Sequence, residues 1–249
     1  MKAYATPHDF PNLDQETKLL AEIGIELEQI DSVDPRTIGE KFKDGVALFV
    51  QYTKIPRETI EQLAQCKIIL RYGFGNDNIA LQAAGERGIH VCNVPHYCGN
   101  EVADHTVSFM LAAARKLVQL NKSVHNGSWS FLQHKPLYTL SGKTLGLIGC
   151  GNIAQKVAFR SKAFGMEVIA YDPWLSADTA AALGIELVSI DELCTRGDFV
   201  SLHLPLSEET HHLVNKALIA KMKDSVIIIN TARGPLVQVE DIRDALLAN

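Results

Sequence analysis

Short apolar runs alternate with helical stretches along the whole 249-residue chain. The runs are four to seven residues long, which is typical of strands. Strands that alternate with helices in this way predict crossover connections and parallel sheets, so the pattern predicts an α/β fold. We expect strands at residues 2–5, 25–30, 46–51, 67–73 and 89–94, and again at 144–149, 166–171, 185–188, 199–204 and 225–230.

Residues that commonly start or stop helices mark the segments between these runs. The segment 13–24 ends at Gly24, and the segment 56–65 begins at Pro56, which are positions where helices favour glycine and proline. We expect further helices around residues 152–165, 177–183, 190–195, 215–222 and 238–248.

One segment, residues 101–127, is predicted to be a single long helix. It contains no proline, and no glycine before Gly127. Acidic residues stand near its start and basic residues near its end, which complements the helix dipole. The turn HYCGN precedes it, so we place a domain boundary near residue 99 and predict two domains, residues 1–98 and 99–249.

The composition is that of an ordinary globular protein, with 47% apolar and 21% charged residues. The net charge of −5 offers no polybasic surface, so we expect neither nucleic acid nor an anionic membrane as a partner. No apolar run reaches the roughly 18 to 20 residues that a membrane span needs, and the first ten residues lack the apolar core of a signal peptide. Five cysteines without CxxC spacing fit a reduced, cytoplasmic protein.

Nine histidines raise the question of a bound metal ion. None lies in an HExxH pattern, and the adjacent pair His211 and His212 is expected to point in different directions on a helix or strand. We therefore expect no metal site and interpret the histidines as solvated or satisfied residues.

The strongest local signal for a ligand is the segment TLGLIGCGNIA, in which an apolar strand runs into Gly149, Gly151 and Ala154 before a helix. In this GxGxxA pattern the first glycine permits a tight turn, the second lets the backbone approach a pyrophosphate, and the small third residue allows close packing of helix and strand. The helix start then offers free N–H groups and the positive end of its dipole to that pyrophosphate. The alternative is a structural turn without a ligand.

The next strand ends at Asp172, about twenty residues after the glycines, where dinucleotide-binding folds carry an acidic residue. A carboxylate there can accept hydrogen bonds from the 2′- and 3′-hydroxyls of a ribose. It would repel a 2′-phosphate, and the residues DPWLS include no arginine to neutralise one. The pattern therefore favours NAD over NADP as the cofactor.

The further segments of interest are RYGFGNDNI (71–79), VCNVPHYCGNEVADHTVSFMLAAARKL (91–117), DFVSLHLPLSEETHHLVN (198–215) and SVIIINTARGPLV (225–237). Together with the glycine turn and the YDP that follows it, they resemble the D-isomer-specific 2-hydroxyacid dehydrogenase family, in its branch around phosphoglycerate dehydrogenase and the C-terminal-binding-protein-like dehydrogenases. The resemblance implies two Rossmann-like domains, a flavodoxin-like N-terminal substrate domain and a doubly wound parallel-sheet NAD-binding domain. It also implies NAD-dependent conversion of a 2-hydroxy or 2-oxo acid, and a homodimer formed through the long helix and the aromatic stretch after it.

Position by position, the resemblance implies that Arg233 is the catalytic group that holds the substrate's carboxylate and keto oxygen beside the nicotinamide. The backbone N–H groups of Phe74, Gly75 and Asn76 would bind the same carboxylate. For Arg233 the alternative is a surface ion pair, and for the loop glycines a purely turn-forming role. The implied cofactor contacts are Thr106 at the phosphate region, Gly149, Gly151, Asn152 and Ile153 at the pyrophosphate, Asp172 and Pro173 at the ribose, His203, Leu204, Pro205 and Thr210 on the adenosine side, and Thr231, Ala232 and Arg233 near the nicotinamide.

Two residues of the substrate loop depart from the family pattern. Asn76 occupies a usually apolar position and Ala80 a usually acidic one, which leaves the identity of the acid open. We interpret His105 as a packed or solvated helix residue and assign no role to His96.

Family members continue past the position of Asn249 with a strand, a loop that carries a glutamate and a loop that carries a histidine. That histidine is the general acid/base and the glutamate raises its pKa; none of the nine histidines here occupies the matching position. We therefore expect a C-terminally truncated sequence in which both domains are incomplete. Three functions stay open: an NAD-dependent 2-hydroxyacid dehydrogenase, an NAD(H)-binding module without turnover, and a product that never folds stably.

Overall fold

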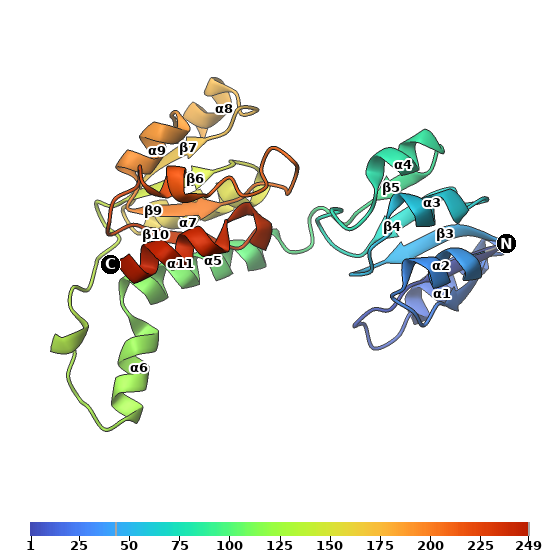
Figure 1. Ribbon diagram of the computed structural model, residues 1–249, viewed down its shortest axis with the longest axis horizontal. Coiled ribbons are helices and arrows are strands. Elements are labelled where there is room, and N and C mark those ends of the chain that lie inside the picture. The colour runs from blue at the N-terminus through green and yellow to red at the C-terminus, as the bar shows by residue number, and fades with distance from the viewer. Residues whose placement is uncertain (43, 249) are drawn as a thin grey trace. The chain divides into compact units, whose positions relative to one another are not determined.

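The computed structural model describes residues 1–42 and 44–248. The chain forms two compact units, Met1–Cys98 and Gly99–Asn249, each built around its own five-stranded sheet (Figure 1). Neighbouring strands in both sheets are parallel. The predicted α/β class with two Rossmann-like parallel sheets is therefore confirmed.

The first unit consists, in chain order, of β1 (Lys2–Ala5), α1 (Asp14–Glu22), β2 (Glu26–Gln29), α2 (Pro35–Lys41), β3 (Gly45–Val50), α3 (Arg57–Gln62), β4 (Ile68–Arg71), α4 (Leu81–Glu86) and β5 (His90–Cys92). Its strand order is β2-β1-β3-β4-β5, which is the order of flavodoxin-like folds. Strand residues such as Leu48 and Ile69 pack with helix residues such as Ile38 and Ile60 in one buried cluster.

The second unit consists, in chain order, of α5 (Gly99–Ala114), α6 (Leu117–His125), η1 (Leu132–His134), β6 (Thr144–Ile148), α7 (Asn152–Ala163), β7 (Glu167–Tyr171), α8 (Ala177–Ala182), β8 (Glu186–Leu187), α9 (Ile190–Arg196), β9 (Phe199–Leu202), α10 (Lys216–Ile219), β10 (Ile227–Asn230), η2 (Gly234–Leu236) and α11 (Val239–Ala248). Its strand order is β10-β9-β6-β7-β8, so the first strand of the unit is central, as in dinucleotide-binding folds. The order reverses between β6 and β9, and ligands of such folds bind at the carboxyl ends of the strands beside this point.

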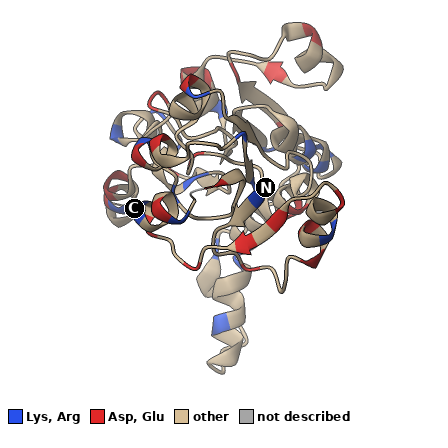
Figure 2. Ribbon diagram, turned by 90° about the vertical axis from the view of Figure 1, so that its right-hand side faces the viewer, with Lys and Arg blue, Asp and Glu red and all other residues tan. Residues whose placement is uncertain are grey.

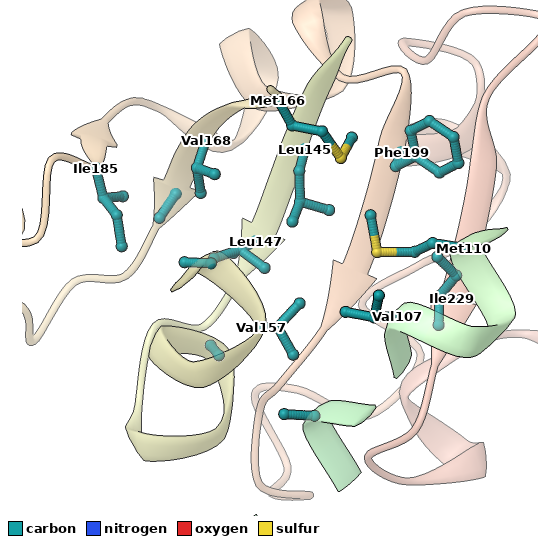
Figure 3. Close-up of a cluster of buried hydrophobic side chains, with 14 of the residues drawn as sticks. Val107, Met110, Leu145, Leu147, Val157, Met166, Val168, Ile185, Phe199 and Ile229 are labelled. Carbon is teal, nitrogen blue, oxygen red and sulfur yellow. The ribbon is translucent and has the colours of Figure 1, made fainter. Parts of the chain in front are cut away.

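The sheet of the second unit has a buried apolar cluster on each face. Leu145 and Leu147 of β6 pack with Val157 of α7 on one face, as Figure 3 shows. Ile148 belongs to the cluster on the other face, together with Leu193 of α9. Because successive side chains of a strand point to opposite faces, a strand covered on both sides needs an uninterrupted apolar run, which TLGLI supplies.

The segment predicted as one long helix is two helices, α5 and α6, so that prediction is wrong. The break lies at Lys116, whose backbone is left-handed with φ 50° and ψ 40°. The carbonyl oxygen of Ala114 accepts a hydrogen bond from the backbone N–H of Tyr138 at 3.0 Å, and the guanidinium of Arg115 donates to the carbonyl oxygen of Tyr138 at 3.2 Å. The end of α5 is therefore held by a residue 23 positions after Arg115, which no local helix signal predicts.

Helix α6 and the loop after it, residues 117–134, project away from the sheet of the second unit (Figure 1); we call this segment the arm. Val118 is 71% exposed and Trp129 is 90% exposed. Lys122 is the single Lys, Arg, Asp or Glu of α6, which is almost without charge in Figure 2. The arm therefore presents apolar side chains of the kind that proteins usually bury at an interface.

Candidate functional site

The turn between β6 and α7 contains two glycines for two different reasons. Gly149 has φ +87°, and a Cβ there would lie 2.7 Å from the carbonyl oxygen of His203, so the fold itself requires glycine. Gly151 has φ −74° as the N-cap of α7, and a Cβ there would meet no atom within 4 Å. Packing does not explain the second glycine, so the open space beside it is available to a ligand that approaches the backbone closely.

The start of α7 offers hydrogen-bond donors beside this open space. Among the described residues, no group accepts a hydrogen bond from the backbone N–H of Asn152 or Ile153. The first N–H groups of a helix lack partners within the helix and carry the positive end of its dipole, so they suit an anion such as a pyrophosphate. Ala154 is completely buried in the cluster between α7 and the sheet, which lets the helix pack closely.

Asp172, just after β7, lies against the glycine turn. Its Oδ2 accepts a hydrogen bond from the backbone N–H of Cys150 at 2.7 Å. Its Oδ1 accepts from the backbone N–H groups of Trp174 at 2.8 Å and Leu175 at 3.2 Å. A carboxylate has about four lone-pair positions, so these bonds leave capacity for about one ribose hydroxyl rather than the two that the sequence suggested.

The segment after β9 also lies against the turn, because a Cβ at Gly149 would meet both the carbonyl oxygen of His203 and, at 2.9 Å, Cδ2 of Leu204. The imidazole of His203 forms a hydrogen bond with Oγ of Ser201 at 2.9 Å. Burial lowers the pKa of His203 to about 4, so the ring is neutral at pH 7. The fold thus brings His203 and Leu204, two of the predicted adenosine residues, against the glycine turn at one edge of the sheet.

Thr210 shapes the loop that follows. Its Oγ1 donates to the carbonyl oxygen of Pro205 at 2.7 Å and accepts from the backbone N–H of Ser207 at 2.8 Å. The hydroxyl of Thr210 is therefore engaged within its own loop and helps to set the shape of that loop; its place beside the adenosine stays a prediction.

The loop after β10 is folded by the side chain of Asn230. Its Oδ1 accepts from the backbone N–H of Ala232 at 3.0 Å, and its Nδ2 donates to the carbonyl oxygen of Arg233 at 2.8 Å. Arg233 is half-buried, and its guanidinium donates to the carbonyl oxygen of Ala232 at 2.8 Å. Asn230, to which sequence reasoning gave no role, therefore fixes the backbone from which the predicted substrate clamp projects.

Thr106 lies in α5 and is completely buried. Its Oγ1 donates to the carbonyl oxygen of Val102 at 2.8 Å and lies 2.8 Å from Oγ1 of Thr231. The predicted contact of Thr106 with the phosphate region of the cofactor stays a prediction; in this structure its hydroxyl is covered and has two partners. The hydroxyl joins α5 to the loop after β10.

A cavity of about 440 Å³ opens beside Thr231. His105 lines this cavity, and its ring meets that of Phe109 edge-on, with the centroids 4.2 Å apart. No functional role was predicted from the sequence for Glu101, His105 or Phe109. Their spacing of four residues could have shown that they share one face of the helix. The cavity is lined by Glu101, Val102, His105, Phe109, Asn230 and Thr231.

The predicted carboxylate-binding loop, residues 74–76, follows β4 in the first unit. The carbonyl oxygen of Phe74 accepts from Nδ2 of Asn93 at 2.6 Å, and that of Asn76 accepts from the backbone N–H of Ile79 at 3.1 Å. The loop is therefore anchored at both ends within its own unit.

His211 and His212 do not point in different directions, contrary to expectation: their ring centroids are 3.7 Å apart. His212 has φ 54°, and this left-handed backbone brings its ring beside that of its neighbour. Within residues 1–42 and 44–248, no group of three or more His, Cys, Asp or Glu side chains is placed to hold a metal ion. None of the helices formed by these residues has both the length and the apolar character needed to cross a membrane.

The chain is similar in sequence to known dehydrogenases and reductases. Residues 107–249 match the family model described as D-isomer specific 2-hydroxyacid dehydrogenase, NAD binding domain. The chain is 43% identical over 231 residues to D-3-phosphoglycerate dehydrogenase of Methanocaldococcus jannaschii, a match that covers 92% of this chain and 44% of that protein. It is 45% identical over 196 residues to hydroxypyruvate reductase of Thermotoga maritima, covering 79% and 63%. The chain therefore spans between 44% and 63% of the length of these two relatives.

Solved structures share the fold over both units. A glyoxylate reductase from Paecilomyes thermophila is 30% identical with a TM-score of 0.90, covering 99% of this chain and 78% of that one. D-lactate dehydrogenase from Aquifex aeolicus, complexed with NAD and lactic acid, is 29% identical with a TM-score of 0.89, covering 99% and 73%.

Proposed function

The chain belongs to the D-isomer specific 2-hydroxyacid dehydrogenase family, and from that premise we propose that the protein transfers hydride between NAD(H) and a 2-hydroxy or 2-oxo acid. Its second unit is an NAD-binding domain of this family. The observation that carries the proposal is the open space beside Gly151 at the start of α7, with the carboxylate of Asp172 attached to the same turn.

The residues of this edge fit a dinucleotide. The N–H groups of Asn152 and Ile153 would hold the pyrophosphate at the positive end of the α7 dipole, and Oδ2 of Asp172 would accept one ribose hydroxyl. His203 and Leu204 would border the adenosine side. NADH, when bound, supplies the hydride for the reaction. The carboxylate of Asp172 disfavours a 2′-phosphate, which supports NAD rather than NADP.

Arg233 is the proposed substrate clamp. A guanidinium can grip a carboxylate through two parallel hydrogen bonds and polarise the neighbouring ketone. Asn230 supports this role because its side-chain amide bonds to the backbone N–H of Ala232 and to the carbonyl oxygen of Arg233, which fixes the backbone at the clamp. In the proposed division of labour, residues 1–98 form the substrate domain, with the backbone of residues 74–76 as the second carboxylate contact, and residues 99–249 form the cofactor domain.

The relatives named above are enzymes, which favours turnover over the alternative of an NAD(H)-binding module without catalysis. Their names include a phosphoglycerate dehydrogenase, hydroxypyruvate and glyoxylate reductases and a lactate dehydrogenase. These substrates share a 2-hydroxy or 2-oxo acid group and differ beyond it, so the proposal names that class. We assign the general acid/base to no residue of this chain.

A homodimer is the proposed assembly, with the arm as its contact. The exposed apolar residues of the arm, among them Val118 and Trp129, would be buried by a second copy of the chain. An isologous contact of this kind is the commonest arrangement of soluble oligomers.

Titration of the intact chain with NADH, followed by calorimetry, tests the shared premise of cofactor binding. Gly151→Val fills the open space and should weaken NADH binding at least tenfold, while Gly85→Val, at a glycine of α4 that is equally open, should leave it unchanged. Consumption of NADH with a panel of 2-oxo acids then tests turnover. Absence of NADH binding by the intact chain would reject the proposal.

A further inference from the structure

The two threonine hydroxyls that join α5 to the loop after β10 have a fixed direction of hydrogen bonding. A threonine hydroxyl carries one proton. Thr106 donates its proton to the carbonyl oxygen of Val102, 2.8 Å away, because a carbonyl oxygen can only accept. The bond of 2.8 Å between Thr106 and Thr231 must therefore take its proton from Thr231. Thr231 has only lone pairs left for any other partner.

Thr231 lines the cavity of about 440 Å³ described above. Asn230 lines it as well, but its amide oxygen and nitrogen are engaged with Ala232 and Arg233. Thr106 is completely buried, so a ligand cannot reach it and reverse the direction of the bond. A group that approaches the hydroxyl of Thr231 therefore meets a hydrogen-bond acceptor.

We propose that Thr106 is a positioning residue that fixes the hydroxyl of Thr231 as an acceptor for the carboxamide N–H of the nicotinamide. This inference rests on the proposed function, because it requires NAD(H) to bind with its nicotinamide end at the loop after β10. A carboxamide offers N–H donors, whereas an acetyl group in the same place offers none. The threonine pair thus selects a dinucleotide that carries the amide over one that lacks it.

Calorimetric titration of the intact chain measures this selection as a ratio of dissociation constants. The two ligands are NADH and reduced 3-acetylpyridine adenine dinucleotide, in which an acetyl group replaces the carboxamide. One neutral hydrogen bond predicts that the wild type binds NADH about fivefold more tightly. In Thr106→Val the proton of Thr231 is released, so its hydroxyl can rotate and donate to the acetyl oxygen, and the ratio should fall to about one. Thr106→Ser keeps the hydroxyl, so this variant should retain the wild-type ratio of the two dissociation constants.

A second variant, Thr231→Val, removes the acceptor itself and should also bring the ratio to about one, so the test does not depend on the folding of a variant at the buried position. A ratio that stays near five in either valine variant overturns the inference, as does an equal fall in Thr106→Ser. Wild-type protein that binds NADH with a ratio near one overturns it and leaves the proposed function standing. Wild-type protein that binds neither dinucleotide rejects both.

Discussion

Alanine at each of the two turn glycines separates what the fold requires from what a ligand requires. At Gly149 the left-handed backbone costs an L-residue about 1–2 kcal/mol. The new Cβ would also lie 2.7 Å from the carbonyl oxygen of His203 and 2.9 Å from Cδ2 of Leu204, and such overpacking costs about 1–3 kcal/mol. Gly149→Ala should therefore lower the free energy of unfolding by about 2–5 kcal/mol.

Gly151→Ala should behave differently. The backbone there, with φ −74°, suits any residue, and the Cβ would meet nothing within 4 Å. Alanine restricts the unfolded chain, which raises stability, but it is a poorer N-cap than glycine, which lowers stability. We therefore expect the free energy of unfolding to change by less than about 1 kcal/mol. The affinity for NADH should fall, because the methyl group occupies the space beside the helix start.

Urea unfolding followed by circular dichroism gives the first quantity, and titration with NADH gives the second. We expect a large loss of stability for alanine at position 149 and a small change for alanine at position 151, only two positions away. Equal losses of stability in both variants would show that the turn does not distinguish the two glycines. A Gly149→Ala protein within about 0.5 kcal/mol of the wild type would refute the strain argument.

The protein should lose stability in acid because of His203, whose pKa is lowered from 6.5 to about 4 by burial in the folded state. The neutral ring costs the folded state nothing above pH 6.5. As the pH falls to 4, the unfolded chain gains a proton that the folded state resists, and the free energy of unfolding should fall by roughly 3 kcal/mol. Urea unfolding at pH 7.5 and 4.5 should show a smaller loss in His203→Asn, and an equal loss would contradict this. Val118→Asp in the arm should shift the protein from dimer to monomer in sedimentation measurements. The control is Val239→Asp on α11, where the side chain is similarly exposed at 68%; it should leave the dimer intact. Dimers that persist in Val118→Asp would exclude the arm as the dimer contact. Lys116→Gly should raise the free energy of unfolding by about 0.5–1 kcal/mol, because glycine adopts φ 50° without strain, and a decrease measured by urea unfolding would be evidence against that strain.

The strands were predictable because their signal is local. Each predicted apolar run overlaps a strand. The run predicted at residues 144–149, for example, is one residue longer than β6, which spans Thr144–Ile148. Helix α2 was not singled out, although the side chain of Asp34 caps it by accepting from the backbone N–H groups of Arg36 and Thr37. At seven residues it is too short for an apolar period to be visible.

The parts of the site that sequence did not reveal depend on contacts between distant residues. The glycine turn and Asp172 form a motif with a known spacing, so they could be found. The bond between Thr106 and Thr231 joins residues 125 positions apart, and the break at Lys116 accompanies contacts with Tyr138. The residues next to Thr106 or Lys116 in the sequence give no sign of these distant contacts.

Asp172 ties coenzyme preference to the architecture of the glycine turn. Exchanging it to admit a phosphorylated ribose would also remove the acceptor of the Cys150 N–H, and an unmatched buried donor costs about 1–3 kcal/mol. A redesign toward NADPH would therefore have to rebuild this support, for example with a serine or threonine hydroxyl at position 172, before a cation for the phosphate is added. Fewer substitutions can therefore change the coenzyme from NADH to NADPH in this protein than in one whose carboxylate contacts only the coenzyme.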